Sequence, residues 1–149
     1  MKTRILISAL VLLSCLSGCA LQGYQGVMTG EYPAVMRIFD LTFGWKKALD
    51  ERGVAIEGYA RNTRYLIIRD LELRVALVAG DGREKARETF LFVPSELREG
   101  DAAPFSVTLK ARPQGGDRLR FIYSYRFSEG DDHSKGDSWM GSFEVDALK

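Results

Sequence analysis

The sequence has one histidine and two cysteines, and this scarcity excludes several kinds of active site. Both cysteines, Cys15 and Cys19, lie in the first 19 residues, so the rest of the chain has no thiol for a disulfide, a metal ligand or a nucleophile. His133 is the single imidazole, which excludes a zinc site with paired histidines. A serine hydrolase would have to use His133 as its base, yet the polar residues around it are more typical of a solvated loop. We therefore expect no catalytic residues, no cofactor, no metal and no enzyme activity.

The chain also lacks a large net charge and a long hydrophobic segment. Its 21 Lys and Arg against 20 Asp and Glu leave no basic stripe, which argues against nucleic acid as a partner. The apolar run at residues 5–16 is too short for a membrane-spanning helix, which needs about 20 residues. Because Lys2 and Arg4 precede this run and small residues follow it, residues 1–18 are predicted to be an export signal peptide.

The predicted signal ends in Leu16-Ser17-Gly18-Cys19. This segment resembles the lipobox of bacterial lipoproteins, and the resemblance implies cleavage between Gly18 and Cys19, a diacylglycerol on the Cys19 sulfur and an acyl group on its amine. Two or more acyl chains anchor a protein stably, whereas one holds it only marginally. By the same resemblance, the non-acidic Ala20 implies the outer membrane, facing the periplasm. The alternatives are a secreted protein with an incidental cysteine at its cleavage site and an uncleaved helix.

Composition along the rest of the chain predicts one domain on a linker. Residues 19–34 would be the lipidated cysteine and a flexible tether, because they contain three glycines and a proline without sustained periodicity. Residues 35–149 are a usual length for a single domain.

Alternation of apolar and polar residues predicts that this domain is all-β. The clearest case is residues 119–127, where aromatic and aliphatic side chains take every second position and should face the core. Glycine-rich segments at residues 80–82 and 115–117 are predicted hairpin turns. The seven predicted strands are residues 35–46, 54–60, 71–77, 86–93, 105–109, 119–127 and 139–145, of which the first is also compatible with a short helix. This pattern favours an antiparallel two-sheet sandwich.

Three segments, residues 56–63, 80–82 and 97–105, carry a resemblance to a known group. Between residues 54 and 127 the chain resembles the FxLyD-type domains and, more distantly, the late-embryogenesis-abundant water-stress domains, which are immunoglobulin-like sandwiches. In the name-giving motif, which would fall at residues 75–79, only Leu77 matches. The resemblance implies a fold and a setting in the bacterial envelope, without catalytic residues. Asn62 is expected to bond its own backbone at a strand end, and Pro104 to fix the chain as it enters a strand.

Two groups of charged residues are candidate sites. Arg118, Arg120 and Arg126 share one face of the aromatic strand and would suit carboxylates or phosphates, although we favour a wet sheet face that discourages edge-to-edge aggregation. In the loop at residues 129–137, the carboxylates of Asp131, Asp132 and Asp137 are of the kind that calcium prefers, but their spacing does not match an EF-hand, and we favour an acidic loop without metal.

Trp45 and Trp139 mark either an interaction surface or the core. Taken together, these features predict a lipid-anchored protein of the cell envelope whose sandwich binds or scaffolds proteins as an accessory to a larger assembly. One alternative is a carrier of lipid or another apolar ligand between the sheets, which requires a large dry cavity. The other is a hydrolase of envelope polymers, which requires two buried carboxylates facing each other in a pocket.

Overall fold

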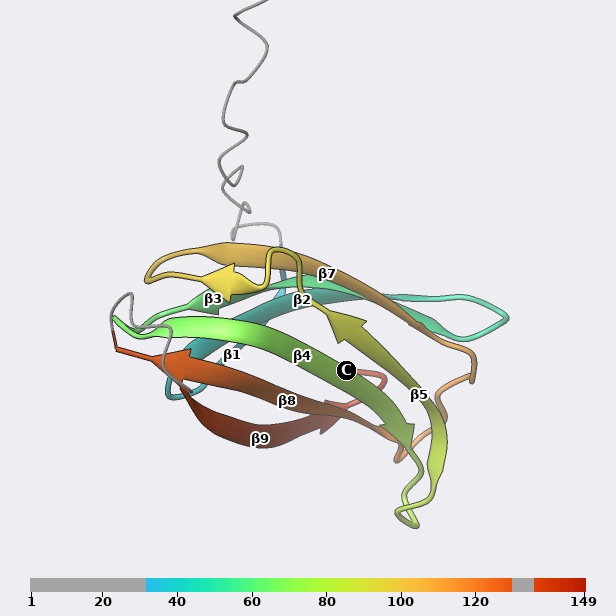
Figure 1. Cartoon of the computed structure of the whole chain (residues 1–149). Coiled ribbons are helices and arrows are strands. Elements are labelled where there is room, and N and C mark those ends of the chain that lie inside the picture. The colour runs from blue at the N-terminus through green and yellow to red at the C-terminus, as the bar shows by residue number, and fades with distance from the viewer. Residues whose placement is uncertain (1–31, 130–135) are drawn as a thin grey trace, which may run out of the picture.

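The computed structural model describes residues 32–129 and 136–149, which form two antiparallel β-sheets (Figure 1). Sheet A has the order β1-β2-β3-β7, and sheet B has the order β5-β4-β8-β9, with β6 paired to β4. The strands are β1 (Ala34–Arg37), β2 (Leu41–Leu49), β3 (Val54–Asn62), β4 (Ile67–Val78), β5 (Glu84–Leu91), β6 (Glu96–Leu97), β7 (Ala102–Leu109), β8 (Arg118–Ser128) and β9 (Asp137–Asp146). Within the described ranges there is no helix long and apolar enough to cross a membrane.

The strand order is that of an immunoglobulin-like sandwich. In sheet A, β2, β3 and β7 correspond to strands A, B and E of such a fold, and in sheet B, β5, β4, β8 and β9 correspond to strands C′, C, F and G. The predicted fold class, an antiparallel two-sheet sandwich, is confirmed. The structure has more strands than the seven predicted, because one predicted strand is two and one predicted loop contains β6.

The predicted strand at residues 35–46 is wrong, because the chain reverses within it. β1 and β2 form a hairpin in which Ala34 pairs with Trp45 and Arg37 with Thr42, and the Ile38 amide donates to the Leu41 carbonyl at 2.9 Å across the turn. In β1 the even-numbered Ala34 and Met36 face the core, whereas in β2 the odd-numbered Leu41, Phe43 and Trp45 do, so the buried set changes at the turn. The sequence hides this change because Val35 and Phe39 are apolar although they are 47% and 72% exposed, so they look like a continuation of the buried set of β2.

The predicted hairpin at residues 115–117 is also wrong. This turn joins β7 in sheet A to β8 in sheet B, so it crosses between the sheets. Asp117 explains why the segment looks like a hairpin turn: its carboxylate accepts from the Gln114 amide at 2.9 Å and from Lys85 Nζ at 2.7 Å. The hydrogen bond from Lys85 is the largest cause of the lowered pKa of Asp117, which keeps the turn carboxylate charged. By contrast, the predicted hairpin at residues 80–82 is confirmed, since it joins the paired strands β4 and β5.

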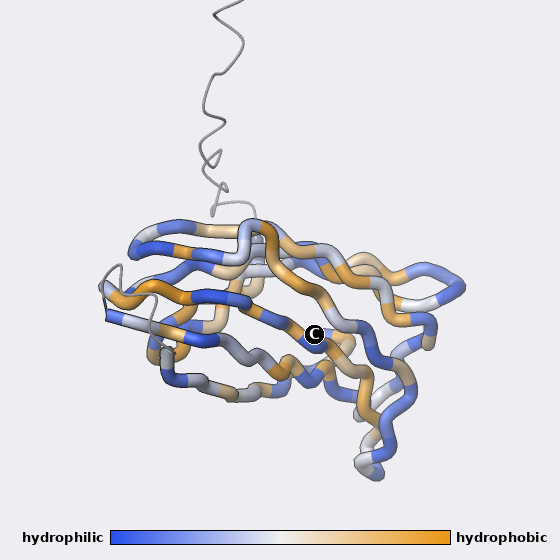
Figure 2. The backbone as a smooth tube through the Cα atoms, in the orientation of Figure 1, coloured by the Kyte–Doolittle hydropathy of each residue, from blue (hydrophilic) through white to orange (hydrophobic). Residues whose placement is uncertain are grey.

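Side chains from both sheets fill the layer between them. Hydrophobic and hydrophilic residues alternate along the strands (Figure 2), and the alternate residues of β8 are buried as predicted. Phe121 of β8 stacks on Phe143 of β9 with ring centroids 4.8 Å apart, and Trp45 of β2 lies 5.0 Å from Phe121 across the sandwich. Trp45 is therefore a core residue, whereas Trp139 in β9 is 51% exposed.

Candidate binding surface on sheet A

The outer face of sheet A is organised in lateral rows set by the strand register. Residues paired across antiparallel strands have Cβ atoms about 4.5–5.5 Å apart, and their sequence neighbours point to the core. The arginine row is Arg37, Thr42, Arg61 and Ala102; the tyrosine row is Val35, Gly44, Tyr59 and Pro104; the ion-pair row is Lys46, Glu57 and Ser106. Each row thus combines residues that are far apart in the sequence.

Tyr59 dominates the tyrosine row and is only 3% exposed, although it lies on the outer face. The ring lies over Gly44, where an added Cβ would be 2.1 Å from Tyr59 Cε1. Tyr32 packs edge-on against Tyr59, with ring centroids 5.3 Å apart. Because Tyr32 is the first described residue, the described domain begins on this face of sheet A.

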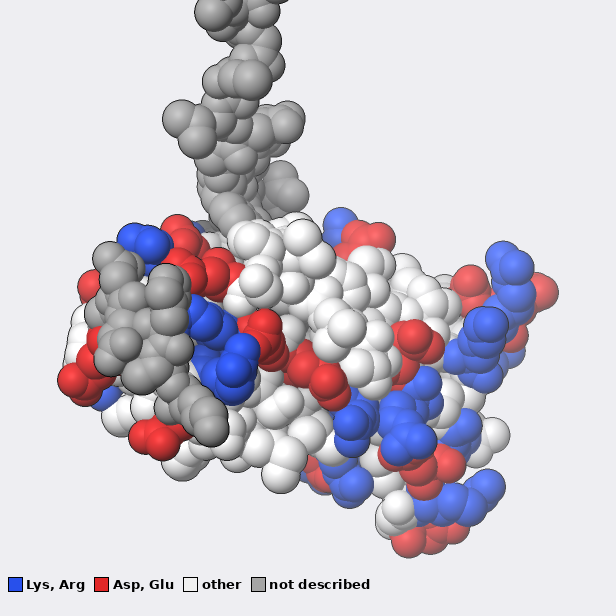
Figure 3. Space-filling view, viewed as in Figure 1, with Lys and Arg blue, Asp and Glu red and all other residues white. Residues whose placement is uncertain are grey.

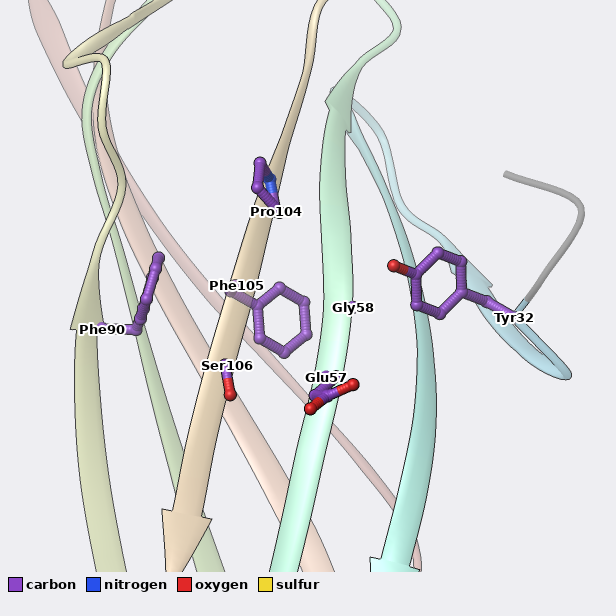
Figure 4. A pocket seen from close by; sticks show the side chains of 7 residues that line it. All are labelled: Tyr32, Glu57, Gly58, Phe90, Pro104, Phe105 and Ser106. Carbon is purple, nitrogen blue, oxygen red and sulfur yellow. The ribbon is translucent and has the colours of Figure 1, made fainter. Parts of the chain in front are cut away.

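A groove of about 330 Å³, here called the apolar groove, opens beside Tyr32. Its lining residues are Tyr32, Glu57, Gly58, Phe90, Pro104, Phe105 and Ser106 (Figure 4). The Phe105 ring lies between β7 and β3, with Tyr32 on one side of it and Phe90 on the other. Gly58 leaves the space open, because an added Cβ would lie 2.7 Å from the Phe105 ring and 2.2 Å from the Gly44 carbonyl oxygen. Most of the lining is aromatic or aliphatic, so the groove suits an apolar group.

The surface next to the groove carries exposed apolar side chains. Leu91 and Val93 follow Phe90 along the chain and are 66% and 83% exposed. Figure 3 shows a broad area without charged side chains between the two charged ends of the molecule. Exposed apolar area of this kind is typical of a binding site.

A second hollow, of about 350 Å³, lies on the same face and is here called the arginine hollow. Its lining residues are Val35, Arg37, Thr42, Tyr59, Arg61 and Thr63. Its lining includes arginine and hydroxyl groups, whereas the lining of the apolar groove is mostly aromatic or aliphatic. Tyr59 lines the arginine hollow, Tyr32 lines the apolar groove, and the two rings are in contact. Sequence patterns missed both hollows, because their residues come together only through strand pairing.

Arg118, Arg120 and Arg126 lie on the outer face of sheet B, and each has a carboxylate partner. Arg118 and Arg120 share Glu144, at 2.9 and 2.6 Å, and the Arg126 Nε donates to Asp70 at 2.8 Å. β8 is hydrogen-bonded to β4 on one side and β9 on the other. The interpretation that these arginines protect a sheet edge is therefore wrong, since β8 is a central strand.

Several predicted site residues lie outside the described residues. These are Gly18 and Cys19 of the lipobox and Asp131, Asp132 and His133 of the acidic loop. Asp137 is described, and it is exposed at the start of β9. Across residues 32–129 and 136–149, no group of three or more His, Cys, Asp or Glu side chains is placed to hold a metal ion.

Two buried carboxylates, Asp40 and Asp117, were not anticipated from the sequence. Asp40 accepts a hydrogen bond from the Tyr125 hydroxyl, and burial, followed by this bond, raises the pKa of Tyr125, so the hydroxyl remains a donor. Asp117 immediately precedes β8, whereas Tyr125 lies eight residues further along, about 25 Å at the usual rise of a strand. The two carboxylates therefore do not face each other, and each has a structural partner.

Comparisons with known proteins give little further information. No protein-family model and no curated protein matches the chain. Among solved structures, the chain is similar to part of a beta-glucuronidase from glycoside hydrolase family 2, with a TM-score of 0.39 and 11% identity. The match covers 68% of this chain and 11% of that enzyme, and likeness at this level says nothing about activity.

Proposed function

We propose that the chain is a lipid-anchored protein of the bacterial cell envelope, attached to the outer membrane and facing the periplasm, whose sandwich is a non-catalytic module that binds a protein partner. The observation that carries the proposal is the position of Tyr32. It lies thirteen residues after Cys19 of the lipobox-like segment, and it is also a wall of the apolar groove. A fully extended chain of thirteen residues spans at most about 47 Å. An anchor at Cys19 would therefore hold the groove close to the membrane.

The surface groove supports protein binding better than ligand carriage between the sheets. A carrier needs a large dry cavity, whereas the rings of Phe43, Trp45 and Phe121 occupy the inter-sheet layer. The apolar groove is at the small end of ligand pockets, which are about 300–1,000 Å³, so it suits one or two side chains of a partner protein. Aromatic walls that enclose such a side chain are typical of the energetically dominant part of an interface. Confinement by the anchor raises the effective concentration of the module, so modest contacts suffice for accessory binding.

The anchor predicts that Cys19→Ala abolishes acylation. Cells expressing the full chain are fed a labelled fatty acid, and incorporation into the purified protein is measured together with the mass of its amino-terminal peptide. We expect complete loss of label in Cys19→Ala, because the acceptor sulfur is gone. Cys15→Ala is the matched control and should keep the label, since Cys15 lies in the apolar run. Label that persists in Cys19→Ala, or that is lost equally in Cys15→Ala, would contradict the anchor.

The groove predicts site-specific crosslinking in intact cells. A photoreactive residue at Ser106, which is exposed in β7 and lines the groove, should give one reproducible protein adduct. The same probe at Ser142, an exposed serine of β9 in the other sheet, is the control and should not give that adduct. Pro104→Glu, which places a charge in the groove, should lower the Ser106 adduct several-fold. The binding proposal fails if Ser106 gives no reproducible adduct or if Ser142 gives the same one.

A further inference from the structure

The arginine row contains two cations that no carboxylate neutralises in the described part of the chain. Arg37 and Arg61 flank Thr42 across three neighbouring strands. In the ion-pair row of the same face, Lys46 meets Glu57 at 3.3 Å, and on sheet B Glu144 serves both Arg118 and Arg120. These charged side chains have partners of opposite charge, whereas the two arginines of the arginine row have none among the described residues.

Arg61 shows the departure most clearly. Its side chain is half-buried, and its Nε is buried without a hydrogen-bond partner. Leaving a buried charged donor unsatisfied is costly, and the Arg61 guanidinium has no compensating contact within the described protein. The Nε itself has almost no exposed surface, so a ligand in the arginine hollow, which the Arg61 side chain lines, would be met by the terminal nitrogens of the guanidinium.

The hollow has the donors and the charge for an oxyanion. Its residues include two guanidinium groups and the hydroxyls of Thr42 and Thr63, and no acidic side chain lines it. Arg37 and Arg61 are two strand spacings apart, about 10 Å, so their side chains approach the space above Thr42 from opposite sides. Donors on opposite sides suit a tetrahedral anion with several acceptor oxygens better than a carboxylate with two.

We propose that the arginine hollow binds a phosphate group, with Arg37 and Arg61 as the principal contacts and Thr42 as a hydroxyl donor between them. A phospholipid headgroup and a free phosphate share this chemistry. The position of the hollow favours a phospholipid headgroup as the source, and this preference rests on the proposed anchor. Tyr59 lines the hollow and contacts Tyr32, so an anchor thirteen residues before Tyr32 would hold the hollow near the membrane surface.

The test uses the full chain purified in a maltoside detergent, which contains no phosphate. Calorimetric titrations with inorganic phosphate and with dihexanoylphosphatidylglycerol measure affinity, and acetate serves as a carboxylate control. We expect Arg61→Ala and Arg37→Ala each to weaken phosphate binding about tenfold or more, because each removes charged hydrogen bonds. Arg52→Ala removes the same charge from an exposed turn and should leave affinity unchanged. Arg61→Lys keeps the charge without the fork and should fall between wild type and Arg61→Ala.

The outcomes distinguish a lipid headgroup from free phosphate, and they test the arginine hollow independently of the anchor. Tighter binding of the short-chain lipid than of phosphate identifies a headgroup site, and equal affinities identify a site for free phosphate; either result supports the hollow. Phosphate affinity that is unchanged in both Arg37→Ala and Arg61→Ala, or lowered as much by Arg52→Ala, overturns it. If Arg61→Ala does not fold, as judged by its unfolding curve, the phosphate affinities of Thr42→Val and Arg37→Ala test the site in its place. Phosphate binding that survives in Cys19→Ala supports the hollow even if acyl labelling disproves the anchor.

Discussion

Replacing Phe121 by alanine is expected to lower the free energy of unfolding by about 3–5 kcal/mol. The Phe121 side chain is fully buried at the centre of β8. Its ring contacts Trp45 of sheet A and Phe143 of β9, so truncation leaves a cavity between the sheets as well as lost contacts on both sides. Denaturant unfolding of the purified chain, followed by tryptophan fluorescence, measures the loss.

The control for this prediction is Ile122→Ala. Ile122 is the next residue of β8 and points to the outer face of sheet B, where it is half-exposed. Its truncation should cost about 1 kcal/mol or less, since little buried area is lost. Comparable losses in the two variants would contradict the assigned orientation of β8, because a shift of one residue exchanges the buried and exposed faces of a strand.

Asn62→Ala is expected to be nearly as damaging, with a loss of about 3 kcal/mol or more. Asn62 is fully buried at the end of β3. Its Nδ2 donates to the carbonyls of Leu66 at 2.6 Å and Leu97 at 3.0 Å, and its Oδ1 accepts from the Arg64 amide at 2.9 Å. Alanine would leave these backbone groups without their partner, and the Leu97 carbonyl would lose a bond that is fully buried.

Two further variants make the Asn62 prediction specific. Asn62→Asp has the same shape and keeps an acceptor for Arg64, but it directs a second oxygen at two carbonyl oxygens; we expect it to be at least as unstable as Asn62→Ala at neutral pH. Thr63→Ala changes the adjacent exposed residue and should be close to neutral. A stable Asn62→Asp variant would show that donation by the amide is unimportant.

Part of the role of Asn62 was predictable, and part was not. Its short side chain and its position before Thr63 predict a local bond to the backbone, and the bond from Arg64 to Oδ1 confirms it. The bond to Leu97, 35 residues away, had no local signal. It exists because β6 pairs with the start of β4 and brings Leu97 over the end of β3. Pro104 is compatible with its strand because β7 is an edge strand of sheet A, where a missing amide donor is tolerated.

The candidate surfaces are likewise only partly predictable from the sequence. The three arginines of β8 can be recognised in the sequence, and in the structure Glu144 and Asp70 are their carboxylate partners. The arginine row cannot be recognised in the sequence, since Arg37 and Arg61 belong to different strands and come together only because both pair with Thr42. The apolar groove likewise depends on the absence of a side chain at Gly58, which matters only once Phe105 and Gly44 are its neighbours.

By itself, the sequence determined that this domain is built from strands with one buried face, because the two-residue period of a strand can be recognised from residues that are close together in the sequence. It also supports the prediction of an anchor at Cys19, which depends on a contiguous segment. Only the tertiary structure decided where the chain reverses, which arginines keep an uncompensated charge and where the outer surface is hollow. These properties depend on register between strands, and hydrogen bonds between residues distant in the sequence set that register.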